Sequence, residues 1–415
     1  MSETPGRDGW ARDAKLVALV SAAHLTSHFY QLVLPPLFPL LTTVFGVGYT
    51  ELGLLATLTY ATSGLMQTPA GILVDRLGSA RVLIGGLGIY STAILCMGLA
   101  PGFWWLAPLA VVAGVGNCVF HPADYAIMTA KVGPRRLGRA FGAHTLAGNI
   151  GWVAAPVAVL ALSSAFGWRA ALVILGGAGL LLTLYLLSQA AVLRADPATP
   201  RRAAPTASRP NNIAGALLSL PILLCFAYFA LLSISQVGLQ TFLPSTLVAA
   251  FALSLESANF LLTALLLASA LGIVAGGIVA DRFRRHELIV AVGLGVAAAA
   301  SLAFLSGPLP LPALTLCAVV AGFAMGGTTP ARDMLVRAAA PPGEGKVFGF
   351  VYSGLDLGGT VTPLLLGYLL DRNLPRLVFV VSAVALFLAI GSAWVVGGDR
   401  VRRRHRKGDA AAPAE

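Results

Sequence analysis

The chain carries one pattern twice, as Gly71-Ile-Leu-Val-Asp75-Arg76-Leu-Gly78 and as Gly277-Ile-Val-Ala-Asp281-Arg282. The two aspartates are 206 residues apart in a chain of 415 residues. Each copy ends one long apolar segment and is followed by another. Internal similarity at half the chain length is typical of membrane proteins built from two homologous halves.

The composition predicts a polytopic membrane protein. Hydrophobic residues make up 57% of the chain and charged residues 11%, and the mean hydropathy is +0.83. Soluble domains carry about 25% charged residues, so this chain has too few to cover a water-facing surface. The net charge of +11 lies in short runs between apolar stretches, which favours anionic lipid headgroups over nucleic acid as partner. No cleaved signal peptide is expected after the polar stretch 1–13.

Apolar runs of about 20 residues predict twelve membrane-spanning helices. They cover 15–42, 50–74, 80–100, 103–130, 138–163 and 168–193, then 214–248, 256–280, 287–306, 311–338, 345–370 and 375–397. The predicted domains are a helical bundle in 1–193, a linker in 194–213, a second bundle in 214–398 and a basic tail in 399–415. With the N-terminus inside, 24 of the 28 Lys and Arg residues fall on the inner side, so both termini are expected to be cytoplasmic.

Further landmarks repeat in the same order in both halves. Gln31-Leu-Val-Leu-Pro35 aligns with Gln240-Thr-Phe-Leu-Pro244 at an offset of 209 residues, and Pro122-Ala-Asp124 aligns with Pro330-Ala-Arg332 at 208. Gly151 and Pro156 align with Gly358 and Pro363 at 207. The repeat therefore predicts two homologous six-helix halves, with a substrate site near the bilayer midplane between them.

Polar side chains inside predicted membrane helices are functional candidates, because burying them in a bilayer is costly. The candidates for a substrate and proton cavity are His24, His28, Gln31, Asn117, His121, Asp124, Tyr125, His144, Asn149, Gln236, Gln240, Arg332, Asp333 and Asp356. Asp124 and Arg332 occupy equivalent repeat positions, so we expect them to pair in at least one conformation. A proton would then compete with Arg332 for Asp124.

The histidines allow more than one interpretation. Their ordinary pKa suits proton transfer, and a structural hydrogen bond is an equally open role for each of them. His24 and His28 also have the i, i+4 spacing of a metal-binding helix face. No carboxylate or cysteine completes such a set on that helix, so neither a metal site nor a cofactor is expected.

A duplicated membrane domain with a Gly-x-x-x-Asp-Arg element in each half resembles the major facilitator superfamily of transporters. The resemblance implies an all-α fold with two six-helix bundles, alternating access, and a cavity lined by the first, fourth, seventh and tenth helices. It also implies a gating role for Gly71, Asp75, Arg76, Gly277, Asp281 and Arg282, with the two glycines allowing neighbouring helices to approach closely. The fifth helix, with Gly142, Gly151 and Ala155-Pro156, looks like a degenerate form of a motif of antiporters in this superfamily.

Two segments are similar to the fosmidomycin-resistance branch of the superfamily. They are Phe120-His121-Pro122-Ala123-Asp124 onward to Gly151, and His24 through Pro39. Members of that branch act as proton-driven drug exporters. The resemblance implies a proton-coupled antiporter. Arg332, the histidines and the glutamines favour a small polar or anionic compound, the composition favours a bacterial inner membrane, and a twelve-helix unit is expected to work as a monomer.

Two other functions are also compatible with the sequence. One is a proton-coupled importer of a metabolite such as a carboxylate, and the other is a non-transporting membrane sensor. Against the sensor, no predicted loop exceeds about 20 residues, which leaves no room for a signalling domain. An enzyme is not expected, because no Walker loop or nucleophile–base pair is recognisable.

Overall fold

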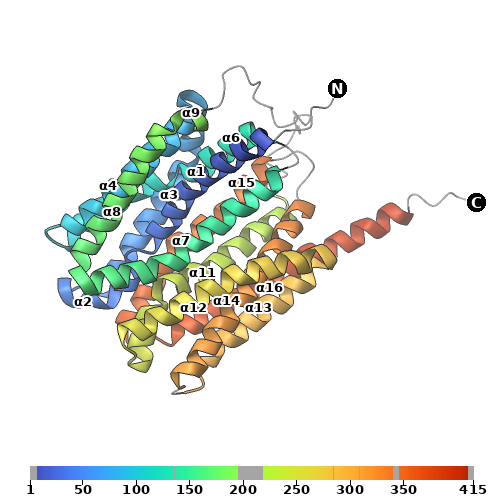
Figure 1. Cartoon of the computed structure of the whole chain (residues 1–415). Helices are drawn as coiled ribbons and strands as arrows, with labels where there is room; N and C mark the ends of the chain where they lie inside the picture. Colours follow the sequence, from blue (N-terminus) through green and yellow to red (C-terminus); the bar gives the residue numbers. More distant parts are fainter. Residues whose placement is uncertain are drawn as a thin grey trace, which may run out of the picture. The chain divides into compact units, whose positions relative to one another are not determined.

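The computed structural model describes residues 7–133, 136–194, 218–283, 285–307, 309–339 and 345–409, and in these ranges all regular structure is helical (Figure 1). The helices of the first half are α1 (Arg7–Gln31), α2 (Phe38–Phe45), α3 (Tyr49–Leu77), α4 (Ser79–Leu99), α5 (Leu106–Asn117), α6 (Phe120–Lys131), α7 (Leu137–Phe166), α8 (Trp168–Ser188) and α9 (Ala190–Leu193), with short 3-10 turns at Pro35–Leu37 and Phe103–Trp105. Those of the second half are α11 (Leu220–Phe251), α12 (Leu255–Arg282), α13 (His286–Ala303), α14 (Leu311–Ala339), α15 (Gly345–Asp371) and α16 (Leu377–Asp409).

Ten helical segments of the described ranges are long and apolar enough to cross a membrane. They are Ala11–Phe45, Ser79–Leu99, Phe103–Lys131, Leu137–Phe166, Trp168–Ser188, Leu220–Phe251, Leu255–Arg282, His286–Ala303, Leu311–Leu335 and Leu377–Val395. The two other predicted spans are present as the long helices α3 and α15, of 29 and 27 residues. Glycine, threonine and tyrosine are frequent in both helices, and they lower the mean hydropathy. An all-helical membrane fold is therefore established, and twelve crossings remain a prediction.

Prolines interrupt two of the segments that the sequence predicts as single helices. A proline ring clashes with the carbonyl group four residues earlier. Pro35 is four residues after Gln31, where α1 ends, and Pro122 is four residues after Cys118, in the break between α5 and α6. The expected helices 15–42 and 103–130 are therefore each divided in two.

The chain forms two compact units. The first comprises Met1–Ala203, Ser254–Thr263 and Pro363–Asp371, and the second comprises Ala204–Leu253, Ala264–Thr362 and Arg372–Glu415. Within the first unit, the Asp371 carboxylate accepts hydrogen bonds from the backbone N–H groups of Tyr49 and Thr50, at 2.7 and 2.8 Å. It therefore caps the N-terminus of α3, where the helix dipole favours a negative charge. The predicted linker lies almost entirely outside the described residues.

The helix pairs inside one half recur inside the other. In the first half α1 packs on α7, α4 on α8, and α3 on α5; in the second half α13 packs on α16. A side chain at Gly272 or Gly276 of α12 would collide with backbone carbonyls of α14, so those two helices touch directly. The equivalent glycines Gly151 and Gly358 show the same relation, since a Cβ on either would collide with a backbone carbonyl, of Leu25 in α1 and of Ala230 in α11. Equal packing at aligned glycines supports the sequence repeat.

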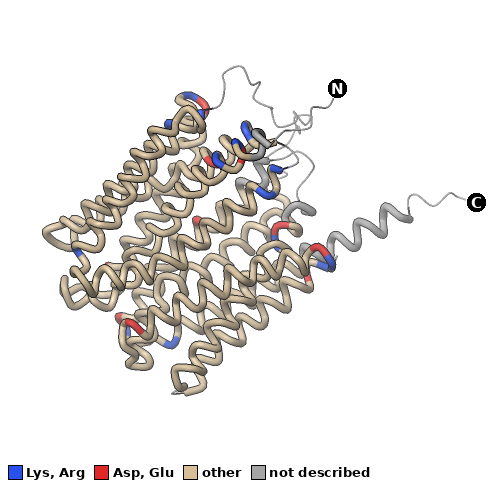
Figure 2. The backbone as a smooth tube through the Cα atoms, in the orientation of Figure 1, with Lys and Arg blue, Asp and Glu red and all other residues tan. Residues whose placement is uncertain are grey.

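The two Gly-x-x-x-Asp-Arg elements lie in the last turns of α3 and α12 rather than in loops. Asp75, Arg76, Asp281 and Arg282 are exposed there. A Cβ on Gly71 or Gly277 would meet no atom within 4 Å, so neither glycine closely contacts another helix of its own unit, and the gating role of the two elements stays a prediction. Charged residues of the described ranges lie mainly near helix ends (Figure 2).

The last helix is longer than expected. The prediction ends it at residue 397, whereas α16 continues to Asp409 through the basic run. This run contains no proline, and Arg and Lys are good helix formers, so nothing in the sequence stops the helix at the end of the apolar segment.

Candidate functional site

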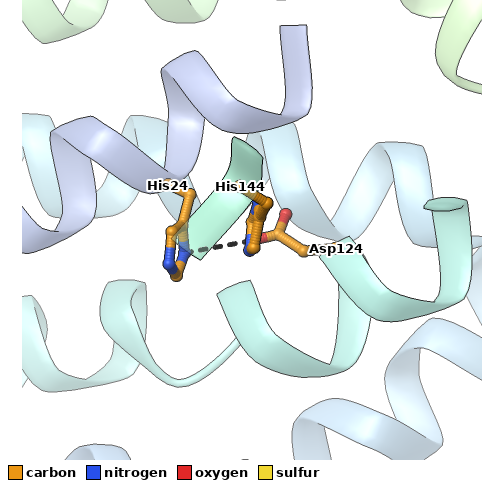
Figure 3. Close-up of side chains that lie close together, drawn as sticks. All are labelled: His24, Asp124 and His144. Carbon is orange, nitrogen blue, oxygen red and sulfur yellow. Dashed lines mark ion pairs between the residues drawn. The ribbon is translucent and has the colours of Figure 1, made fainter. Parts of the chain in front are cut away.

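Three buried side chains from three helices meet inside the first unit, and we call them the His–Asp cluster: His24 of α1, Asp124 of α6 and His144 of α7 (Figure 3). His24 Nδ1 lies 3.3 Å from Asp124 Oδ2, and His144 Nε2 lies 3.5 Å from the same oxygen. The rings of His24 and His144 are stacked, with centroids 3.8 Å apart. Exposed fractions are 3%, 0% and 2% for His24, Asp124 and His144.

The local sequence explains how these helices come together. The break before α6 places Asp124 in the first two turns of a new helix, two residues after Pro122. On α7, Gly148 is one turn beyond His144, and a Cβ there would lie 2.8 Å from the His28 ring and 2.9 Å from His24 Nε2. Gly148 and Gly151 thus allow α1 and its histidine rings to pack directly on α7.

Further aromatic rings surround the cluster. His28 stacks on Trp152 with centroids 4.3 Å apart, and the indole Nε1–H of Trp152 donates a 3.0 Å hydrogen bond to Gln31 Oε1. The His121 ring lies 5.6 Å from that of His24, and Tyr125 stacks on His121 at 6.1 Å. His121 and Tyr125 are exposed, whereas the three residues of the cluster are buried behind them.

Electrostatically, the cluster is a carboxylate without a permanent counter-ion. No Lys or Arg of the described ranges lies within ion-pair distance of Asp124, and neither carboxylate oxygen has a hydrogen bond. The two histidine nitrogens are within ion-pair range but lack hydrogen-bond alignment. An isolated buried charge costs several kcal/mol or more, so a proton on Asp124 or on one of its histidines must balance the site.

The same three residues could also hold a metal ion. One donor atom from each lies within 4.8 Å of the others. Sequence spacing pointed to His24 and His28 on one helix, and it could not show that the carboxylate and the second imidazole come from α6 and α7. Proton handling and metal binding therefore use the same atoms, and an experiment must separate them.

The second unit holds a different polar group, around Arg332 of α14. Arg332 Nε donates to Asp333 Oδ1 at 2.9 Å, and its guanidinium lies 4.8 Å from the centroid of the Phe229 ring. Tyr352 of α15 also donates to Asp333 Oδ1, at 3.0 Å. Asp333 thus neutralises Arg332 inside this unit, and pairing of Arg332 with Asp124 remains a prediction.

The other sequence candidates lie apart from the His–Asp cluster or belong to the second unit. Asn117 donates to Ser63 Oγ of α3 at 2.9 Å, and Asn149 donates to the Thr145 carbonyl of its own helix at 2.9 Å. Gln240 is buried in α11, whereas Gln236 of α11 and Asp356 of α15 are half-buried.

Sequence reasoning missed Trp152, Phe229 and Tyr352, which contact the predicted residues directly. For Trp152 a signal exists: residues 144, 148 and 152 share one face of α7 at i, i+4 and i+8. Aromatic residues are common in membrane helices, so the other two carry no such signal.

Ten candidate spans and a buried ionisable cluster in one unit define a polytopic membrane protein with a polar interior. A family model described as Major Facilitator Superfamily matches residues 20–246 and 230–414. The chain therefore belongs to the major facilitator superfamily: it is a membrane transporter of small molecules rather than an enzyme, a multi-pass protein of the bacterial inner membrane.

Similar proteins agree with this assignment. The chain is 26% identical to the fosmidomycin resistance protein of Escherichia coli (strain K12) over 381 residues, covering 89% of each chain. It is 26% identical to the multidrug resistance protein MdtG of Serratia proteamaculans (strain 568), covering 97% of this chain and 98% of that one. A bacterial homologue of the human lysosomal transporter Spinster, solved in an inward-facing and unoccupied conformation, has the same fold, with a TM-score of 0.79 at 19% identity over 97% of this chain and 99% of that one.

Proposed function

We propose that this chain is a proton-coupled antiporter that exports a small polar or anionic compound by alternating access. The observation that carries the proposal is Asp124, a carboxylate with no exposed surface, no hydrogen bond and two histidines within 3.5 Å. Ionisable groups at such positions in membrane helices are typical of proton relays.

The cluster suits the exchange of a proton for another ligand. With one proton shared among Asp124, His24 and His144, the site has no unpaired charge. Loss of that proton leaves a buried anion, which must be relieved by a conformational change or by a new cation. The exposed His121 and Tyr125 provide a polar route between this site and the surroundings.

The export direction and the substrate class rest on other observations. Two relatives that align with nearly the whole chain are named for fosmidomycin resistance and for multidrug resistance. Arg332, with a side chain that is 12% exposed, offers guanidinium N–H groups beyond the Nε that Asp333 binds, and these favour an anionic group.

The proposal is tested with purified protein in proteoliposomes that contain a pH-sensitive dye. A panel of small anionic and cationic compounds is added outside, with EDTA present so that metal binding cannot produce the signal. We expect compound-dependent proton movement in the wild type. Asp124→Asn should abolish it, because the amide cannot exchange a proton, and Asp124→Glu should retain part of it.

The matched control is Glu256→Gln, which removes an exposed carboxylate at the start of α12. This variant should behave as the wild type. Proton movement that persists in a folded Asp124→Asn protein would exclude Asp124 as the proton carrier. Compound flux without any proton movement in the wild type would exclude proton coupling.

A further inference from the structure

A cavity of about 510 Å³ lies in the first unit between one end of α1, the end of α6 and the short helix α9. The described residues that line it are Ala11, Arg12, Lys15, Lys131, Ala191 and Val192. Three of these six residues are cationic, none is acidic, and the other three are small and apolar. Figure 2 shows Lys and Arg residues gathered at this end of the unit.

Asp13, which lies between Arg12 and Lys15 in the sequence of α1, does not neutralise these cations. The Asp13 carboxylate is bound by Arg136, at 2.7 Å from Nη2 and 2.8 Å from Nε. Arg12 and Lys15 are exposed, and no hydrogen bond or ion pair joins either of them to a residue whose side chain the structure describes. Their positive charges are therefore available to a ligand in the cavity.

The short helix α9 forms the wall of the cavity that faces α1. Lys131 Nζ donates a 2.6 Å hydrogen bond to the Val192 carbonyl, which ties the end of α6 to α9. Ala191 and Val192 then provide an apolar surface opposite the α1 cations. A ligand that fits must combine a negative group with an apolar body.

The distance of the cavity from the buried His–Asp cluster, measured along α1 and α6, places the cavity at the level of the lipid headgroups. Lys15 precedes His24 by nine residues on α1, and Lys131 follows Asp124 by seven residues on α6. At 1.5 Å per residue, the cations lie roughly 10–14 Å along the helices from the buried cluster. The Lys and Arg distribution predicts that this end faces the cytoplasm.

We propose that this cavity binds the phosphate-bearing headgroup of an anionic phospholipid. Basic cavities between membrane helices on the cytoplasmic side are suited to such headgroups, because each cation near the lipid surface attracts it and the acyl chains remain in the bilayer. A lipid there would contact both α1 and α6, the helices that carry His24 and Asp124. This site is separate from the transport pathway and does not depend on proton coupling.

The test compares lipid retention by native mass spectrometry. The full chain is purified from vesicles of equal parts phosphatidylglycerol and phosphatidylcholine, as the wild type and as Arg12→Gln/Lys15→Gln. The control Arg81→Gln/Arg139→Gln removes two exposed cations at positions outside the cavity lining. Lys131 stays unchanged because its hydrogen bond holds α9.

We expect the wild type and the control to retain phosphatidylglycerol. The cavity variant should bind it about 30-fold more weakly, which corresponds to about 2 kcal/mol for two cations. Equal retention by the cavity variant and the wild type would overturn the proposal. Retention of phosphatidylcholine as strong as that of phosphatidylglycerol would also overturn it. Displacement of the lipid by millimolar inorganic phosphate would overturn it too and would assign the cavity to free phosphate.

Discussion

Asp124 and Arg332 stand at equivalent positions of the two halves, yet the two charges are balanced in different ways. Arg332 has a carboxylate beside it in the chain, a tyrosine that holds that carboxylate and an aromatic ring beneath it. Asp124 has only imidazoles within ion-pair range, and their charge depends on protonation. A permanent pair suits a fixed binding group, whereas a conditional pair suits a group that gains and loses a proton.

A substitution at Trp152 separates the packing around the His–Asp cluster from the proton transfer proposed for the cluster itself. Trp152→Phe keeps an aromatic ring against His28 but removes the indole N–H that binds Gln31 Oε1. We expect the free energy of unfolding to fall by about 1 kcal/mol, the usual value of one such hydrogen bond. Proton movement in proteoliposomes should persist, because the His–Asp cluster is untouched.

The measurement is a thermal melt in detergent beside the dye assay, with Trp104→Phe as the control at a tryptophan that is 66% exposed. Loss of proton movement in well-folded Trp152→Phe protein would assign Trp152 to the proton pathway instead.

The residues of the site were predictable, but their partners were not. Burial cost alone identifies His24, Asp124 and His144 from the sequence, because ionisable residues are rare in membrane helices. The i, i+4 spacing suggested His28 as the partner of His24 in a metal site. The His24 ring in fact lies 4.3 Å from His28 and 3.8 Å from His144, and its Asp124 contact comes from α6. Contacts between helices depend on packing, which spacing along one helix does not encode.

At the scale of helices, aligned residues of the repeat have unequal effects. Pro35 lies beside Pro36 and near Pro39, and this run separates α1 from α2. The aligned Pro244 is alone, and α11 continues through it. Pro244 removes one backbone hydrogen bond, whereas the three prolines between 35 and 39 remove three within five residues. The glycine pair 151 and 358, in contrast, has the same packing role in both halves.

Gly151 gives a direct test of the contact between α1 and α7. A Cβ there collides with the Leu25 carbonyl oxygen, a backbone atom that cannot rotate away, so Gly151→Ala should destabilise the protein by about 1–3 kcal/mol. Gly142 lies on the same helix, and a Cβ there meets nothing within 4 Å. Gly142→Ala should therefore be neutral or stabilise by up to about 1 kcal/mol.

The measurement compares the melting temperatures of the two variants in the same detergent. Equal melting temperatures for Gly151→Ala and Gly142→Ala would mean that α1 and α7 do not pack as closely as the structure shows.

At the scale of the whole molecule, composition and the length of the apolar runs predicted the helical membrane class, whereas the division into bundles 1–193 and 214–398 stays a prediction. Segment ends were less predictable. The two units include Ser254–Thr263 and Pro363–Asp371 with the first half, although the chain places them in the second. The unit to which a segment belongs depends on contacts such as the hydrogen bond between Asp371 and the Tyr49 backbone of α3. Nothing in the sequence around these two residues predicts that contact.

The number of membrane crossings can be tested directly at α3 and α15, because these two helices are less apolar than the ten candidate spans. If α3 crosses, its two ends must face opposite sides of the membrane. In a cysteine-free background, Val47→Cys before α3 should react with an impermeant maleimide added to intact cells, and Ser79→Cys after it should react only once the cells are permeabilised. Leu374→Cys, between α15 and α16, should again react from outside. Labelling of Val47→Cys and Ser79→Cys from the same side would leave α3 on the membrane surface, and the orientation inferred from the Lys and Arg distribution would then be wrong for every later helix.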